Sequence, residues 1–154
     1  MFRELRRIDK KMDEEKIVEI LTNGDYGVLS VIGDNGYPYG VPLNYYYEDG
    51  FIYFHCAETG HKIDAISNNA KVSFVIIDSC EIIPEELNTH FASVSIFGKA
   101  SIIGEKNILA PLKKLGMKYS SQHESILEKG IEKNLKNTSM IMIEIEHMMG
   151  KSAK

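Results

Sequence analysis

Residues 51–64 read FIYFHCAETGHKID, and they join six β-prone residues to the expected start of a helix. Because successive side chains of a strand point to opposite faces, Tyr53 and His55 share one face of this expected strand, and Phe54 and Cys56 share the other. Both faces are apolar enough to be covered. The stretch therefore predicts a strand, a short connection and a helix, and the rest of the fold can be read outward from this unit.

The connection, Thr59-Gly60-His61-Lys62, has the composition of a phosphate site. The first N–H groups of a helix have no partner within the helix and lie at the positive end of its dipole. Gly60 permits a close approach, and Lys62 adds a full positive charge. A second interpretation needs no ligand: Thr59 caps the helix, while His61 and Lys62 face solvent. These four residues alone leave both interpretations open.

His55 and Cys56 also allow two interpretations each. A neutral imidazole on a strand can hydrogen-bond a ligand, relay a proton or fill a satisfied place in the core. An unpaired cysteine is commonly a small buried hydrophobe, and no neighbouring pattern indicates a lowered thiol pKa at Cys56. By position alone, core filling is the better interpretation of both.

Toward the amino terminus, two glycine-containing pairs predict hairpin turns. Asn35-Gly36 and Asp49-Gly50 readily take positive φ angles, and they separate expected strands over residues 26–32, 37–47 and 51–56. The second of these strands contains two prolines, which cannot donate to a ladder and favour an edge or a bulge. We therefore expect that strand to be bent.

Hydrophobic periodicity divides the remainder into helices and strands. We expect helices over 13–24, 62–68, 106–119 and 125–135, strands over 71–77, 91–103 and 139–145, and a polar loop over 78–90. The charged side chains of the 106–136 helices are typical of a solvated face. About six strands with flanking helices favour an antiparallel barrel, in which closure removes exposed edges, built as one domain over residues 1–154.

Composition excludes several classes of function. A net charge of −4 argues against a basic nucleic-acid surface. Cys56 and Cys80 lack metal-ligand spacing and are expected to be reduced thiols. Residues 1–13 are too charged for a signal peptide, and no apolar run reaches membrane-spanning length. We therefore expect a cytoplasmic protein with neither a nucleic-acid nor a membrane partner.

Taken in order, these segments resemble the nitroimidazole-reductase (Nim) branch of the pyridoxamine 5′-phosphate oxidase-like FMN-binding split-barrel superfamily. The resemblance covers most of the chain. It rests on GVL at 27–29, GYPYGVPLNY at 36–45, IYFHCAETGHKID at 52–64, NNAKVSF at 68–74, SVSIFGKA at 93–100 and GK at 150–151.

The resemblance implies an antiparallel split β-barrel homodimer that holds FMN between its subunits. It implies that the residues matching Thr59 to Lys62 hold the phosphate and that the flavin ring rests against the strand matching Pro42 to Tyr45, near His55. It names His55 as the catalytic residue. The implied cofactor-binding residues are Pro42, Leu43, Asn44, Tyr45, His55, Cys56, Ala57, Thr59, His61, Lys62, Ser93, Val94, Ile96 and Lys151, the last four as neighbours from the second subunit.

The function implied is an FMN-dependent oxidoreductase that reduces small electron-poor aromatic molecules, as a nitroimidazole reductase does. The alternative is a module that binds flavin or another planar cofactor without turnover. Relatives that oxidise pyridoxamine phosphate carry a C-terminal segment rich in Arg, His and Trp, whereas this chain has no Trp and ends GKSAK. We therefore expect vitamin B6 oxidation less than reduction.

Overall fold

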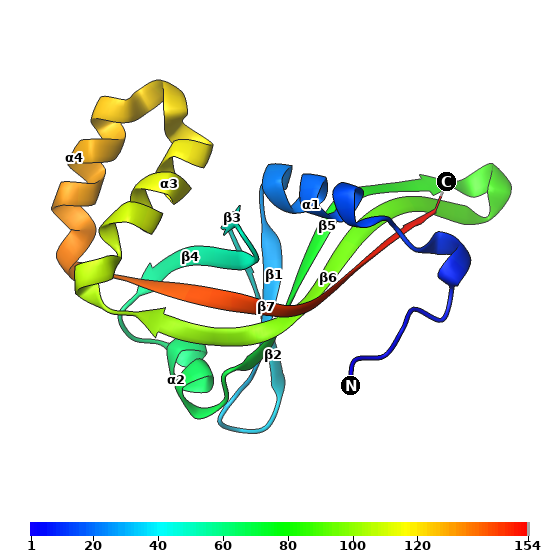
Figure 1. Cartoon of the computed structure of the whole chain (residues 1–154), viewed down its shortest axis with the longest axis horizontal. Coiled ribbons are helices and arrows are strands. Elements are labelled where there is room, and N and C mark those ends of the chain that lie inside the picture. Colours follow the sequence, from blue (N-terminus) through cyan, green and yellow to red (C-terminus); the bar gives the residue numbers. More distant parts are fainter. Residues whose placement is uncertain (154) are drawn as a thin grey trace.

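The computed structural model describes residues 1–153, and its strands form one antiparallel sheet with helices around it (Figure 1). The sheet order is β2-β1-β5-β6-β7-β4-β3. The strands are β1 Gly27–Ile32, β2 Pro38–Leu43, β3 Tyr46–Glu48, β4 Phe51–Ala57, β5 Lys71–Ile83, β6 Asn88–Ile103 and β7 Thr138–Ala153. The expectation of a mainly β fold with six or more antiparallel strands is therefore confirmed.

The helices begin and end close to the places that the sequence predicts. They are α1 Glu14–Asn23, α2 His61–Asn68, α3 Leu109–Ser120 and α4 Glu124–Asn134, with short 3₁₀ turns at Ile8–Lys10, Pro84–Glu86, Glu105–Asn107, Ser121–His123 and Leu135–Asn137. Asp13 caps α1, since its Oδ1 accepts the Lys16 N–H at 2.8 Å. Across residues 1–153, the helices fall short of the length and apolar character needed to cross a membrane.

The two edge strands explain why the sheet curls into a split β-barrel. β2 ends at Leu43 and β3 begins at Tyr46, so only Asn44 and Tyr45 separate the two edges of the sheet. Three Cα–Cα steps span at most about 11 Å, and the opposite edges must therefore come together. Within residues 1–153 no ladder joins β2 to β3. Closure is thus incomplete, and we call the gap at Asn44 and Tyr45 the seam.

Local turn chemistry matches the expected hairpins. Gly36 has a φ of 80°, and Asp49 and Gly50 have φ angles of 48° and 85°, as the Asn-Gly and Asp-Gly pairs predict. β2 lies at an edge, as its prolines predict, and the strand expected over 37–47 is interrupted at the seam. The edge position is therefore confirmed, but the single bent strand is not, because the segment divides into β2 and β3 at opposite edges of the sheet.

The hydrophobic core fills the barrel and extends under α1. Leu29, Phe54, Phe74, Ile96 and Ile141 are completely buried at its centre. A second, smaller cluster forms around Ile108, Leu115 and Met140 where α3 packs on the sheet. Because this second cluster is separate, α3 and α4 form a distinct layer beside the barrel (Figure 1).

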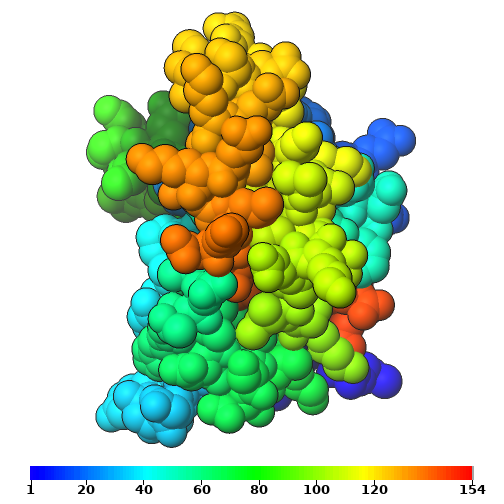
Figure 2. All heavy atoms as spheres, turned by 90° about the vertical axis from the view of Figure 1, so that its left-hand side faces the viewer, coloured from blue at the N-terminus to red at the C-terminus, as the bar shows by residue number. Residues whose placement is uncertain are grey.

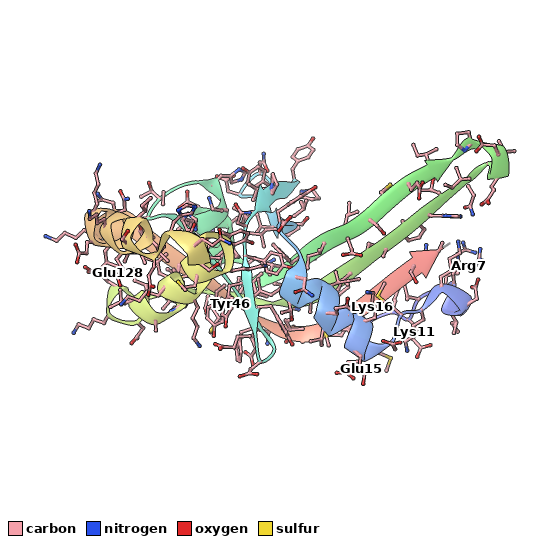
Figure 3. The ribbon with its side chains drawn as sticks, turned by 90° about the horizontal axis from the view of Figure 1, so that it is seen from above. Arg7, Lys11, Glu15, Lys16, Tyr46 and Glu128 are labelled. Carbon is pink, nitrogen blue, oxygen red and sulfur yellow. The ribbon has the colours of Figure 1, made fainter. Side chains whose placement is uncertain are left out.

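The prediction of a polar loop over residues 78–90 is wrong. β5 and β6 continue through this segment as a paired hairpin, from Ser79 opposite Ala92 to Ile83 opposite Asn88, after a register shift at Ile77. Figures 1 and 3 show this hairpin, here called the arm, reaching beyond the barrel. Most of its residues are exposed on both faces, so the alternation of apolar and polar residues that predicts a strand is absent.

The last strand is also longer than expected, because it runs to Ala153 instead of ending near residue 145. It pairs with β4 through residues 138–144 and with β6 through most of its length. Glu146 lies opposite a break in register with β6, and this irregularity interrupts the pattern in the sequence. Lys151 therefore belongs to a strand.

Candidate functional site

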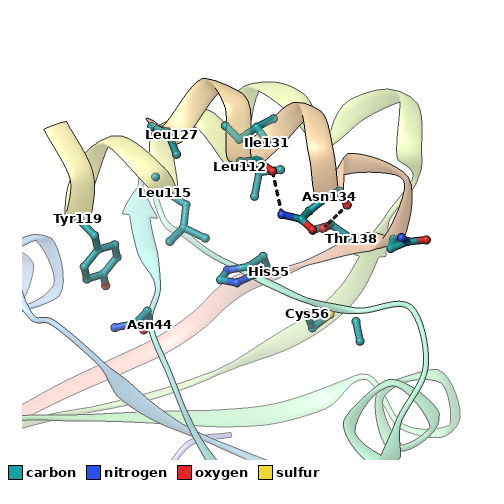
Figure 4. Close-up of a pocket in the computed structure, with 14 residues that line it drawn as sticks. Asn44, His55, Cys56, Leu112, Leu115, Tyr119, Leu127, Ile131, Asn134 and Thr138 are labelled. Carbon is teal, nitrogen blue, oxygen red and sulfur yellow. Dashed lines mark hydrogen bonds between the residues drawn. The ribbon is translucent and has the colours of Figure 1, made fainter. Parts of the chain in front are cut away.

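A cavity of about 600 Å³ lies between the end of β4 and the α3–α4 hairpin (Figure 4). Its volume is in the range of small-molecule sites. Figure 2 views this end of the molecule, with α4 in orange and α3 in yellow-green standing above α2 in green. The cavity thus has a floor from the barrel and a roof from two helices.

The floor brings together four residues that the sequence predicts for the site: Asn44, His55, Cys56 and Ala57. The His55 side chain is exposed and points up beneath Leu115 (Figure 4). The interpretation of His55 as a core residue is therefore wrong, and so is the expectation that both faces of β4 are covered. Cys56 is buried, as an ordinary core cysteine is. Burial raises the pKa of its thiol, and the nearby charge of Lys62 partly opposes this rise.

The roof consists of residues that sequence reasoning missed. One face of α3 contributes Leu112, Leu115, Gly116 and Tyr119, one face of α4 contributes Leu127, Gly130, Ile131 and Asn134, and Asn137 and Thr138 complete the lining. Both helical sets follow the spacing of a single helix face. This spacing was the available signal, but it does not distinguish a face that packs on a sheet from one that covers a cavity.

The C-terminal end of α3 is pinned to the seam by Lys118 and Tyr119. Lys118 Nζ donates to the carbonyls of Gly24 at 2.6 Å and Tyr45 at 3.0 Å, and it lies 4.0 Å from the centre of the Tyr45 ring. The Tyr119 hydroxyl lies 2.7 Å from the Asp25 carbonyl and 2.9 Å from that of Tyr45. These contacts hold the roof over the floor.

Lys118 is therefore not part of a solvated face, which corrects the sequence interpretation. Burial lowers the pKa of its ammonium to about 8, and the charge of Asp25 opposes the change. Burial likewise raises the pKa of the Tyr119 hydroxyl. Lys114, on the same helix, remains exposed and forms an ion pair with Glu48 at 2.6 Å.

The start of α2 has the features that a phosphate requires. Gly60 is the N-cap, and no side chain caps the helix, so the idea that Thr59 caps it is wrong. Gly60 has a φ of 137°, and a Cβ there would meet nothing within 4 Å. Among residues 1–153, no side chain therefore accepts from the first N–H groups of α2. Thr59 is exposed, and Lys62 is half-buried beside them.

The His61 side chain is directed toward the β1–β2 turn. Its ring stacks on Tyr39 with centroids 4.5 Å apart, and Nε2 lies 3.9 Å from Asp34 Oδ1. Consequently the His61 imidazole is engaged with the β1–β2 hairpin, and the part of His61 that belongs to the helix start is its backbone N–H. A contact between the His61 ring and a bound cofactor stays a prediction.

The four predicted residues at the seam differ in what they expose. Pro42 and Asn44 are exposed, and Leu43 is half-buried. Tyr45 is completely buried, and its hydroxyl donates to the Leu21 carbonyl at 2.7 Å. The Tyr45 backbone is occupied as well, because its N–H donates to the Tyr119 hydroxyl at 3.1 Å and its carbonyl accepts from Lys118 Nζ at 3.0 Å. The structure therefore gives Tyr45 a structural role at the seam, and a contact with a ligand stays a prediction.

The last four predicted residues lie far from the cavity. Ser93 pairs with Lys151, and the side chains of Val94 and Ile96 are completely buried. Lys151 follows Met140, which lies opposite His55, by eleven positions on β7, and an extended strand of that length spans about 36 Å. One chain therefore does not bring these residues to the same small ligand as His55.

Two comparisons by sequence have different outcomes. The family described as pyridoxamine 5′-phosphate oxidase matches residues 13–152. No protein of curated function matches the chain.

Solved structures share the fold. A protein provisionally assigned to 5-nitroimidazole antibiotic resistance in Bacteroides thetaiotaomicron is 20% identical, with 92% of this chain and 85% of that chain covered and a TM-score of 0.74. The flavocytochrome Anf3 of Azotobacter vinelandii is 19% identical, with 99% and 73% covered and a TM-score of 0.83. A FAD-binding protein of Mesorhizobium loti is 23% identical, with 94% and 98% covered and a TM-score of 0.66.

Proposed function

Because this chain belongs to the pyridoxamine 5′-phosphate oxidase family, we propose that it binds FMN and uses it to reduce small electron-poor aromatic molecules. The observation that carries the proposal is the exposed His55 on the floor of a largely apolar cavity. His55 lies near the end of β4, and the connection that follows β4 leads to a helix start suited to phosphate. The likeness to a nitroimidazole-resistance protein and to flavin-binding proteins supports it.

The phosphate of FMN is held by the start of α2. The N–H groups of His61 and Lys62 and the hydroxyl of Thr59 donate hydrogen bonds, and the Lys62 ammonium supplies charge. From there the floor of the cavity leads past Ala57 and Cys56 to His55. Pro42, Leu43 and Asn44 would border the ring at the seam, where Tyr45 fixes the backbone through its contacts with α1 and Lys118.

Bound FMN supplies the hydride, and the chain supplies orientation and a proton. The His55 side chain is exposed and lines the cavity, so its ring is accessible to a ligand. An imidazole here donates a proton or hydrogen bond to the acceptor oxygen as negative charge develops on it. Reduction is favoured over vitamin B6 oxidation, because the cavity lining drawn from residues 1–153 contains no Arg or Lys to hold the phosphate of the vitamin.

The proposal includes a C2 homodimer in which each site uses both chains. Ser93 and Lys151 lie at the arm end of one chain, where Ile82 is 73% exposed and Leu87 is 97% exposed. An isologous interface places the arm end of one chain against the cavity end of the other. Sedimentation at micromolar concentration measures this: a monomer with full FMN affinity contradicts the dimer.

The test of the function is anaerobic flavin reoxidation. The purified protein is loaded with FMN, reduced, and mixed with 2-methyl-5-nitroimidazole. We expect reoxidation coupled to loss of the nitro absorbance, and His55→Ala should keep FMN but react roughly 10²- to 10⁴-fold more slowly. His61→Ala is the control, expected to change affinity before rate. Tight FMN binding without any electron transfer identifies the alternative, a cofactor-binding module without turnover.

A further inference from the structure

The side chain of His61 connects the start of α2 to a hairpin that lies more than twenty residues earlier in the chain. His61 is the first residue of α2, yet its ring leaves the helix and stacks on Tyr39 of β2, with centroids 4.5 Å apart and planes inclined by 21°. Its Nε2 atom lies 3.9 Å from Asp34 Oδ1. The proposed phosphate site is therefore linked to the β1–β2 hairpin, beside which α2 lies (Figure 1), through one imidazole.

Gly33 shows that this contact is built into the hairpin. A Cβ on Gly33 would lie 2.8 Å from His61 Nε2 and 3.0 Å from Asn35 Oδ1. The backbone itself does not demand a glycine there, because Gly33, unlike Gly36, lies outside the positive-φ region. Gly33 is also buried, although it belongs to a turn. A side chain at position 33 is therefore disfavoured because the His61 ring and the Asn35 amide occupy the space beside it.

The hairpin gives the ring a firm support. Tyr39 lies opposite Val31 in the β1–β2 ladder, and the turn is closed by the Gly33 N–H, which donates to the Tyr37 carbonyl at 2.9 Å. Asn35 Oδ1 accepts the Tyr37 N–H at 3.0 Å. Because residues on paired strands hold their geometry better than residues on loops, Tyr39 offers the His61 ring a fixed surface.

The helix start benefits from such a support, because the connection before it has little of its own. Residues 57–60 are exposed, and the N-cap, Gly60, is a glycine with a φ of 137°. N–H groups bind an anion best when they already point toward it, since ordering them on binding lowers the affinity. The stacked ring fixes the first residue of the helix and with it the direction of the N–H groups of His61 and Lys62.

We propose that Tyr39 is a positioning residue for the cofactor phosphate and that it acts through the His61 ring. The ring is a strut between the hairpin and the helix, and its nitrogens are not needed to bind the cofactor. Asp34 contributes little, because its side chain is 75% exposed and an exposed ion pair is weak. The identity of the ligand rests on the function proposed above, whereas the strut is a contact of the folded chain itself.

The test is a double-mutant cycle in the full chain. Tyr39→Ala, His61→Ala and the double variant remove the stack, whereas Tyr39→Phe and His61→Phe keep an aromatic ring at each position. Tyr37→Ala is the matched control, because Tyr37 lies on the same hairpin and is 73% exposed. For each protein we measure the affinities for FMN and riboflavin by flavin fluorescence, and the hydrogen–deuterium exchange of the amides of residues 60–64 without flavin.

Either single alanine variant should weaken FMN about three- to tenfold, as expected for the loss of one aromatic stack, and leave riboflavin within twofold. The double variant should lose no more than His61→Ala, because Tyr39 acts only through His61. Both phenylalanine variants and Tyr37→Ala should stay within twofold of the wild type. Amide exchange at the start of α2 should become faster in the variants that lose the stack and in no others.

Three results would overturn the proposal: independent losses of FMN affinity from the two alanine substitutions, a His61→Phe protein that binds FMN as weakly as His61→Ala, or amide exchange that Tyr39→Ala leaves unchanged. Lys62→Ala, measured alongside, separates this failure from a failure of the phosphate site. If Lys62→Ala weakens FMN selectively and Tyr39→Ala does not, the phosphate site stands and the strut fails. If the whole expected pattern holds but reduced FMN passes no electrons to 2-methyl-5-nitroimidazole, the proposed function fails and the strut stands.

Discussion

Tyr45→Phe tests whether the seam tyrosine is a structural residue or a ligand contact. In the structure the Tyr45 side chain is completely buried, and its hydroxyl donates to the Leu21 carbonyl at 2.7 Å. Leu21 lies in the last turn of α1, where carbonyls have no partner within the helix. The hydroxyl therefore caps α1, and the substitution removes this cap while the ring stays in place.

The expected cost follows from that geometry. Removing the donor leaves a buried carbonyl without its hydrogen bond, which costs about 1–3 kcal/mol. For a chain of this size, each kcal/mol lowers the melting temperature by about 2–4 °C. We expect the midpoint of urea unfolding to fall with an unchanged slope, and FMN affinity to stay within twofold of the wild type.

Tyr46→Phe is the matched control, because the Tyr46 hydroxyl reaches only the half-exposed Glu48, at 3.0 Å. It should cost less than about 0.5 kcal/mol. A Tyr45→Phe protein of unchanged stability, or one whose flavin affinity drops tenfold, would refute the assignment of this hydroxyl to α1.

Three further predictions concern Lys62 at the start of α2, Lys118 on α3, and the contact between α3 and α4 at Gly116. Lys62→Ala should weaken FMN at least tenfold more than riboflavin in fluorescence titrations, because only FMN carries the phosphate; equal losses would return Lys62 to a surface role. The folded pKa of Lys118 is about 8, below its ordinary 10.5, so the folded state holds fewer protons between these values and the free energy of unfolding should rise with pH across this window. After allowance for partial exposure we expect about 1 kcal/mol, and a Lys118→Met protein with the same rise by urea unfolding would contradict it. Gly116→Ala should lower the free energy of unfolding by about 1–2 kcal/mol, because a Cβ there would lie 2.3 Å from Leu127 Cδ1. A Cβ at Gly130 would meet nothing within 4 Å, so Gly130→Ala should raise the free energy of unfolding, and calorimetry that finds both variants stabilised would contradict the close helix contact.

Helix caps and hairpin turns were predictable from the sequence, because they depend on residues that are neighbours along the chain. Asp13 caps α1 and Asp49-Gly50 forms its turn for reasons contained in a few residues. The alternation at His55 placed it opposite the buried Phe54, and the floor of the cavity follows from that alternation.

Features that depend on distant or missing contacts were not predictable. The arm has no buried face, so its strands carry no period of two. The role of Tyr45 depends on α1, which precedes it by more than twenty residues. The roof residues Leu115 and Ile131 have the spacing of any packed helix, and only the folded structure shows that they line the same cavity as His55.

The position of β7 in the sheet determines when this protein can acquire its site during synthesis. Of the strands in residues 1–153, β7 leaves the ribosome after all the others, yet it lies between β6 and β4 and is the sole link from the β3–β4 hairpin to the rest of that sheet. Until it emerges, β4 and β6 each present an unpaired edge, which invites pairing with other chains. His55 therefore has no fixed surroundings before residues 138–144 are available. Nascent chains that stall before Thr138 should neither retain cofactor nor stay dispersed without a chaperone.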